Sequence, residues 1–388
     1  MKIEQGSWSP ENGFSNTTPL ENAQWVLYFS SFQNLKEDTF FPALKARFPH
    51  AHITGATSGG EIAGNTTQDD SYVYVATHFD HVRVKTTICP ITHNHLNPLE
   101  LTQGSYECGV TLAKDLAQDK DLRAIFLLSD GIPVNGSALL KGINSVIDPA
   151  HVTVTGGFAC DGGPYVETRV GCNAPVASHQ IVAVGLYGDA LEVKVGCEGG
   201  WSEFGPIRQI TKAHDNALLE LDGKPALDIY KQYLGDDAKN LPASALKYPL
   251  GIWDQNKEGA RYIIRTIHQI VEGDHTIHFS GDVPQGWKAR LMWGRFDAIV
   301  EGAAKASKQA EPTDLTGPSL SILVSCLGRK VLMGQRVAEE ISASAEVLGN
   351  DNTRIGFYSL GEIAPHELSK ESAFHNQTMT ITTFYEKV

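Results

Sequence analysis

The sequence predicts a mixed α/β protein of two domains, with mixed sheets built from repeated strand–helix–strand modules and added antiparallel hairpins. Its 388 residues exceed the usual size of one domain. Apolar runs typical of buried strands alternate with segments whose apolar residues recur at helical spacing. The phrase G-x-x-S-x-G-E-I-A occurs twice, starting at Gly55 and at Gly356. This repetition indicates that one unit has been duplicated.

The first module surrounds Gly55. The apolar run WVLYFSS predicts a buried strand over residues 25–31, and a helical segment follows over 35–49. Residues 51–63 begin as a second strand and end in glycines. The alternating pattern of residues 71–88 then predicts a half-exposed hairpin.

The middle module repeats this order without the full phrase. A strand is predicted over residues 124–131, a helix over 136–147 and a returning strand over 151–163, which again ends in glycines. The alternation over residues 179–196 predicts a second hairpin.

The last module surrounds Gly356. Its first strand is predicted over residues 321–329, its helix over 337–348 and its returning strand over 354–364. Residues 376–386 alternate as a terminal strand.

A change of pattern near the middle of the chain predicts the domain boundary. Over residues 220–249 the strand-like alternation gives way to a helical, then proline-rich and polar stretch. We therefore expect one domain over residues 22–220 and another over 221–388. The second domain has further strands and a helix of its own, predicted over residues 260–270, 275–283, 288–296 and 297–310.

Charge and cysteine usage narrow the class of protein. The formal net charge of −13 disfavours nucleic acid or an anionic membrane as partner. There is no basic, apolar leader and no run of about 18 apolar residues, so we expect a cytoplasmic protein. The six cysteines form no C-x-x-C pair, and most should be free thiols.

Polar residues gather at the carboxyl edge predicted for the last module. A strand–helix–strand connection gives parallel neighbours, and ligands in open α/β sheets bind beyond the carboxyl ends of the strands. If the terminal strand runs antiparallel, its start lies at the same edge. The residues expected at this ligand site are Ser325, Cys326, Arg329, Tyr358, Ser359, Gly361, Glu362, His375 and Asn376.

A charged pair at this edge suits a free amino acid. Arg329 could clamp its carboxylate in two-pronged fashion, and Glu362 could pair with its ammonium group. The competing interpretation is a glycine turn without a ligand, in which Glu362 caps a helix or faces solvent.

A catalytic alternative is a thiol hydrolase with Cys326 as nucleophile, His375 as base and Asn376 as orienter. His375 and Asn376 are adjacent and would point apart on a strand, so we expect no enzyme activity. His93 and His95, in the segment HNH, are expected in a solvated loop rather than at a metal.

The ordered set of motifs resembles the FIST family of sensory proteins. GATSGGEIAG, LLSDG, GGFACDGG and ELDGKPALDIYKQYLG resemble its N-terminal domain. SILVSCLGRK, IGFYSLGEIAP and FHNQTMTITTFYE resemble its C-terminal domain. The resemblance covers residues 22–384 and implies a ligand-sensing module of signal transduction, with amino acids proposed as ligands.

A subgroup of free-standing members implies a second ligand, since those proteins bind haem, sense nitric oxide and control a separate histidine kinase. The resemblance thus favours haem with nitric oxide as the small-molecule ligand. It also implies a histidine kinase or another signalling protein as partner, and leaves a homodimer open. Arg329 would hold a haem propionate, and His375 or Cys326 would ligate the iron. The competing expectation for His375 is a hydrogen bond to backbone.

Overall fold

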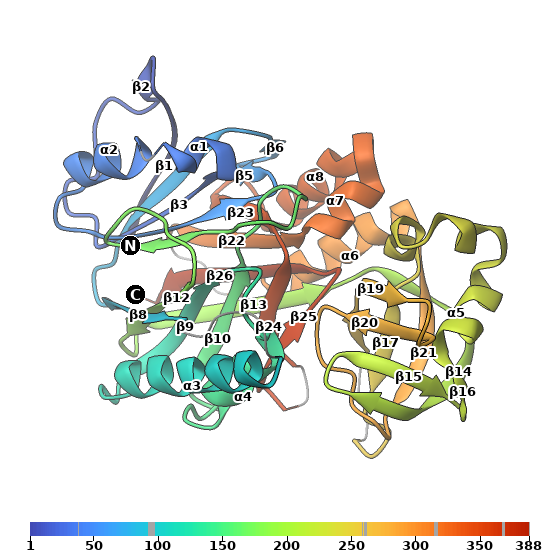
Figure 1. The fold of residues 1–388 in the computed structure, drawn as a ribbon. Helices are drawn as coiled ribbons and strands as arrows, with labels where there is room; N and C mark the ends of the chain where they lie inside the picture. Colours follow the sequence, from blue (N-terminus) through green and yellow to red (C-terminus); the bar gives the residue numbers. More distant parts are fainter. Residues whose placement is uncertain are drawn as a thin grey trace.

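A computed structural model describes residues 1–37, 39–91, 98–257, 259, 262–313, 317–366 and 369–387. In this part of the chain, three six-stranded sheets form a layered core and one eight-stranded sheet forms a separate lobe beside it (Figure 1). The mixed α/β fold class is therefore confirmed.

The first sheet contains the first module. Its strands β3 (Trp25–Ser31) and β4 (His52–Ser58) run parallel. Helices α1 (Phe32–Lys36) and α2 (Phe40–Arg47) connect them. The sheet is completed by β11 (Val170–Cys172), β7 (Tyr72–His78), β1 (Lys2–Ser9) and β2 (Gly13–Phe14), in the order β11-β4-β3-β7-β1-β2.

The second sheet contains the middle module, with β9 (Leu122–Ser129) parallel to β10 (Thr153–Phe158). Helix α4 (Gly136–Asn144) connects these strands and packs beside α3 (Pro98–Leu116) (Figure 1). The other strands are β25 (Ser372–His375), β24 (Gly361–Pro365), β12 (Gln180–Tyr187) and β8 (Arg83–Pro90), in the order β25-β24-β10-β9-β12-β8.

The third sheet contains the last module, with β22 (Ser319–Cys326) parallel to β23 (Asn352–Ser359). The connection holds α7 (Leu327–Met333), the short helix η3 (Gly334–Arg336) and α8 (Val337–Leu348), and α6 (Phe296–Gln309) precedes the module. Strand β26 (Met379–Glu386) lies antiparallel to β22, as predicted. The remaining strands are β13 (Leu191–Glu198), β5 (Glu61–Ala63) and β6 (Thr66–Gln68), in the order β13-β26-β22-β23-β5-β6.

The eight-stranded sheet spans residues 201–294 and is called the barrel below. Its two outermost strands are separated in the chain by Thr266 alone, so the sheet bends round to enclose an interior. Helix α5 (Ala226–Leu234) covers this interior, followed by η1 (Gly235–Asn240) and η2 (Ala243–Lys247). The strands are β14 (Trp201–His214), β15 (Ala217–Leu221), β16 (Lys224–Pro225), β17 (Leu250–Trp253), β18 (Ile263–Arg265), β19 (Ile267–Val271), β20 (Thr276–Phe279) and β21 (Lys288–Gly294).

The three modules are interlocked in a cycle. After each returning strand the chain crosses to a neighbouring module: β5 pairs with β23, β24 with β10, and β11 with β4. Side chains from all three sheets, such as Phe29, Phe126 and Phe357, share one apolar core. Phe29 stacks on Phe357 with ring centroids 4.4 Å apart. Burial of this shared core stabilises the modules together.

The two hairpins predicted after the first and middle modules are wrong, although all four strands exist. Strand β7 pairs with β1 and β3, whereas β8 pairs with β12 in another sheet. Similarly β12 pairs with β8 and β9, whereas β13 pairs with β26. The physical reason is that alternation is a local pattern and does not specify a pairing partner. Both edges of β7 and of β12 are paired with strands that lie elsewhere in the chain.

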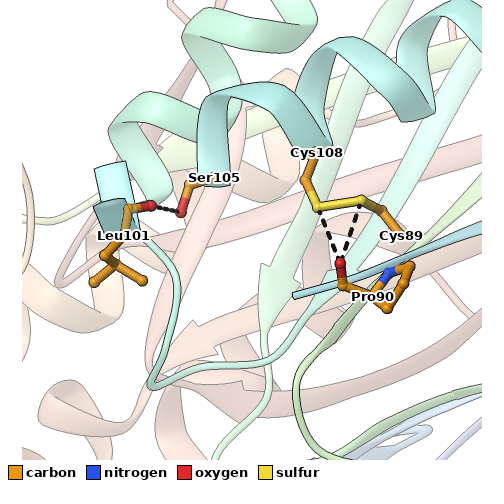
Figure 2. The surroundings of a disulfide bond; sticks show 5 residues. All are labelled: Cys89, Pro90, Leu101, Ser105 and Cys108. Carbon is orange, nitrogen blue, oxygen red and sulfur yellow. Dashed lines mark hydrogen bonds between the residues drawn. A yellow bond between two sulfur atoms is a disulfide. The ribbon is translucent and has the colours of Figure 1, made fainter. Parts of the chain in front are cut away.

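A disulfide joins Cys89, near the end of β8, to Cys108 in α3 (Figure 2). The other four cysteines are free, as expected for most of the six: Cys160, Cys172, Cys197 and Cys326. None of the helices in the described part of the chain is long and apolar enough to cross a membrane.

Candidate functional site

The first copy of the repeated phrase holds a buried carboxylate. Ser58, at the end of β4, donates a hydrogen bond to Glu61 Oε1. Ser71 donates to Glu61 Oε2 from its N–H, at 2.8 Å, and from its hydroxyl, at 2.9 Å. Because Ser71 directly precedes β7, Glu61 caps the start of the strand that follows the module.

The second copy has the same arrangement. Ser359 donates to Glu362 Oε1 at 2.8 Å, and Thr378 donates to Glu362 Oε2 from its N–H, at 3.0 Å, and from its hydroxyl, at 2.8 Å. Burial raises the pKa of Glu61 and of Glu362 to about 7. The phrase therefore specifies a carboxylate that organises a strand end.

The middle module performs the same task with another residue. Asp130, at the end of β9, accepts a hydrogen bond from the hydroxyl of Thr168 and one from the N–H of His179 at 2.6 Å. His179 directly precedes β12, so Asp130 also caps the start of a following strand. Burial raises its pKa.

Arg329 lies at the predicted edge but is already fully bonded within the chain. Its side chain is completely buried and pairs with the equally buried Glu340 at 2.8 Å. It also donates to the carbonyl oxygens of Gly199 at 2.6 Å, Ile299 at 3.1 Å and Gln377 at 3.5 Å. Gly199 lies just before the barrel and Ile299 lies just after it, so Arg329 binds both chain connections of the barrel.

Glu340 is the shared partner of several of the predicted residues. Its Oε1 accepts hydrogen bonds from Ser325 Oγ and Tyr358 Oη, both at 3.0 Å. Sequence reasoning missed this residue. The available signal was its helical spacing to Ser344 and Leu348, which places Glu340 on the buried face of α8.

His375 and Cys326 are buried and do not face an open site. His375 is 7% exposed, and its Nε2 lies 3.2 Å from the carbonyl oxygen of Ala364. Burial and the nearby Arg265 lower the pKa of His375 to about 4, which leaves the imidazole neutral near pH 7. Burial also raises the pKa of the Cys326 thiol, which makes it a poor nucleophile. Neither side chain offers iron or a substrate a ligand in this arrangement.

Gly361, at the same edge, allows the ring of Phe374 to pack closely against its backbone. Its backbone pairs with Phe158 of β10, and a Cβ atom there would lie only 2.3 Å from the ring of Phe374. The glycine is therefore required by a close contact between strands.

Two buried amides stand out between β25 and β26. Asn376 is 1% exposed and Gln377 is 0% exposed, yet Asn376 Nδ2 and Gln377 Oε1 have no hydrogen-bond partner among the described residues. The other atom of each amide reaches the barrel over a long bond of 3.5 Å, from Thr266 N to Asn376 Oδ1 and from Gln377 Nε2 to Leu246 O. Thr266 Oγ1 lacks a partner as well. We call Leu246, Thr266, Asn376 and Gln377 the seam.

Metal binding finds no support in the described ranges, where His, Cys, Asp and Glu side chains form no group of three or more that could hold an ion. The predicted loop around His93 and His95 lies outside those ranges.

The interlocked sheets of the core and the separate barrel define a two-part α/β protein. Residues 24–224 match the FIST N domain and residues 226–365 match the FIST C domain. The chain therefore belongs to the FIST family, whose domains sense small ligands in signal transduction.

An archaeal protein from Methanocaldococcus jannaschii, named only as uncharacterized protein MJ1623, is similar to this chain. It is 26% identical over 264 residues, which cover 61% of this chain and 49% of that protein. The chain thus spans about half the length of this curated relative.

Proposed function

We propose that this protein is a cytoplasmic, non-catalytic sensor that binds a small polar molecule at the seam. The observation that supports it is the pair of unpartnered amide atoms at Asn376 and Gln377. Nearly all buried polar groups in native proteins have a partner, so a buried donor and acceptor without one favour a ligand or bound water there.

The neighbouring charges favour an uncharged hydrogen-bonding group on the ligand. Arg329 is neutralised by Glu340, and Glu362 already accepts three hydrogen bonds. A carboxylate could reach Arg329 only by breaking a buried ion pair, at a cost of about 3–5 kcal/mol. We therefore favour an amino acid whose side-chain amide or hydroxyl group binds at the seam over one whose carboxylate binds Arg329. Haem with nitric oxide becomes the alternative, because His375 and Cys326 do not fit iron as they are placed.

The output would be a change in how the barrel sits on the core. The backbone oxygen of Gln377 accepts hydrogen bonds from Trp201 Nε1 at 2.8 Å and from Arg329 at 3.5 Å. Trp201 begins the barrel, and Arg329 holds both of its connections. A ligand at the Gln377 amide would shift the position of the barrel on the core, and a separate partner such as a histidine kinase would respond to this shift.

A thermal-shift screen of free amino acids tests the ligand site. We expect at least one to raise the melting temperature of the wild type, by an amount that grows with concentration. This shift should disappear in Asn376→Leu or Gln377→Leu, because each substitution removes one of the two unpartnered amide atoms. Gln103→Leu, on the exposed surface of α3, is the matched control and should retain it. A shift that survives in both seam variants would contradict the site.

An absorption spectrum of the haem-incubated protein tests the alternative. A Soret band that moves on addition of nitric oxide and is lost in His375→Ala would favour haem. Without such a band, the amino acid proposal stands by itself.

A further inference from the structure

The interior of the barrel is apolar, and the seam residues are not among its lining. Buried side chains from several strands and from α5 converge there: Leu218, Ile229, Leu250, Ile277, Phe279 and Leu291. Interiors and mouths of closed sheets are frequent sites for small molecules, because the strands provide a rigid apolar wall.

A small hollow remains among these side chains. Its volume is about 20 Å³, which is room for about one water molecule. Its lining is almost wholly apolar, so water gains few hydrogen bonds there, and the surrounding atoms lack packing partners. An apolar group that entered this barrel hollow would recover those contacts.

Strand β14 is irregular beside the hollow. It pairs with β21 up to Phe204 and again from Arg208, with an irregularity between these two positions. The segment in between bulges: Gly205 has a φ of +74°, Pro206 has no N–H, and Ile207 is 52% exposed. Phe204, Pro206 and Arg208 all line the hollow, so the bulge forms part of its wall. Arg290 Nε donates a hydrogen bond to the carbonyl oxygen of Gly205 in this bulge at 2.9 Å.

Arg208 supplies a polar group in this part of the wall that is only partly bonded. Its guanidinium donates to Asp222 at 2.9 Å and to the hydroxyl of Tyr233 at 2.5 Å. Its Nε is buried and has no partner among the residues described. The Arg208–Asp222 pair is partly exposed, unlike the buried Arg329–Glu340 pair, so its charges are screened by solvent. Arg208 Nε can therefore still donate to an anionic head whose compact apolar tail lies in the hollow.

We propose that the barrel binds a small monocarboxylate, with its tail in the hollow and its carboxylate accepting a hydrogen bond from Arg208 Nε. The tail needs more room than the hollow provides. Tyr233 is partly exposed and its ring lies under the bulge at Gly205. The tail would enter by displacing this ring and its hydrogen bond from Arg208. This site shares no lining residue with the seam and does not rest on the function proposed above.

Titration of the full chain with benzoate, followed by calorimetry, tests the proposal. Benzyl alcohol, which has the same ring and no charge, is the matched ligand. We expect saturable benzoate binding in the millimolar range, weakened about tenfold or more in Arg208→Gln, since a hydrogen bond to a charged group is lost. Benzyl alcohol should not discriminate between the two proteins. Lys212→Gln, an exposed position further along β14, should leave both ligands unaffected.

Substitutions that fill the hollow test whether the apolar tail of the ligand binds there. Ala289→Leu and Ile277→Phe introduce bulk from two different strands, and each variant that keeps the wild-type circular dichroism spectrum should lose binding of both ligands. Absence of saturable benzoate binding to the wild type would overturn the proposal. Equal affinity in Arg208→Gln, or full binding in a folded variant with a filled hollow, would do so as well.

Discussion

Glu362 and Glu61 make stability depend on pH. Burial raises the pKa of each to about 7 in the folded chain, from 4.5 for the free side chain. The folded state thus holds these protons more tightly than the unfolded state. Their contribution to stability is complete below about pH 4.5 and is lost as pH rises towards 7, by roughly 3 kcal/mol for each carboxyl.

Urea unfolding of wild type and Glu362→Gln at pH 5 and pH 8 measures this effect. We expect the free energy of unfolding to fall less between the two pH values in the variant, because one buried ionisation is absent. Glu301→Gln, on the exposed face of α6, should behave like the wild type. Parallel pH profiles for Glu362→Gln and the wild type would show that this carboxyl does not titrate as described.

The buried pair Arg329–Glu340 is the second residue-scale test. Arg329→Met or Glu340→Gln alone leaves an uncompensated buried charge and should cost about 3–5 kcal/mol. The double variant removes both charges and keeps an acceptor for Tyr358, so it should cost clearly less than the sum. The exposed pair Arg336–Glu339 serves as control, with an expected coupling below about 1 kcal/mol. Additive costs at Arg329 and Glu340 would refute the pairing.

Sequence reasoning placed several of the predicted residues at one sheet edge but did not show how they are bonded. Ser325, Arg329 and Tyr358 do lie together at the end of parallel strands, because strand order and crossover hand fix which ends meet. Their shared partner Glu340 comes from a helix whose rotation about its axis depends on packing. Local pattern therefore could not show that Arg329 is already occupied.

At the scale of elements, the disulfide joins β8 to α3. Sequence spacing gave no sign of it, because Cys89 and Cys108 meet only when the helix packs on the sheet (Figure 2). The carbonyl oxygen of Pro90 lies near both sulfur atoms, at 3.8 Å from Cys89 and 3.7 Å from Cys108. Such bonds are uncommon in a reducing cytoplasm, so the redox state of this pair depends on the compartment.

Thiol titration of the denatured, unreduced protein checks this bond directly. We expect four reactive thiols rather than six. Because the closed loop has a sequence separation of 19 residues, reduction should lower the free energy of unfolding by about 3 kcal/mol. Cys89→Ser/Cys108→Ser should match the reduced wild type, whereas Cys172→Ser should not lower stability to that extent. Six reactive thiols would exclude the disulfide.

The wrongly predicted hairpins show the limit of element-level reasoning. Alternation identified β7, β8, β12 and β13 as strands, because each has a local apolar pattern. Pairing is a long-range property, and the short connections could have joined neighbours in one sheet. Both edges of β7 and of β12 are paired with strands from elsewhere in the chain, so β8 and β13 pair in other sheets.

At the scale of the whole molecule, the cyclic exchange of strands makes the core one unit and the barrel an insertion. Each module gives a strand to the next, so no module keeps its sheet alone. The barrel, by contrast, leaves and returns at nearly one point: a Cβ atom on Gly200 would lie 2.0 Å from the carbonyl oxygen of Ala298. The core should therefore tolerate loss of the barrel better than loss of a module.

Two truncations distinguish these roles. A chain that lacks residues 201–294, with a short glycine linker across the gap, should still unfold in one cooperative transition, because the shared core around Phe29, Phe126 and Phe357 remains intact. A chain that ends at residue 220 loses β22, β23 and β26 and exposes that core, so it should aggregate or melt without cooperativity. Circular dichroism melts of both chains measure whether each unfolds cooperatively. A cooperative melt of the 220-residue chain, together with collapse of the chain without the barrel, would mean that the barrel and not the cycle of strands holds the core together.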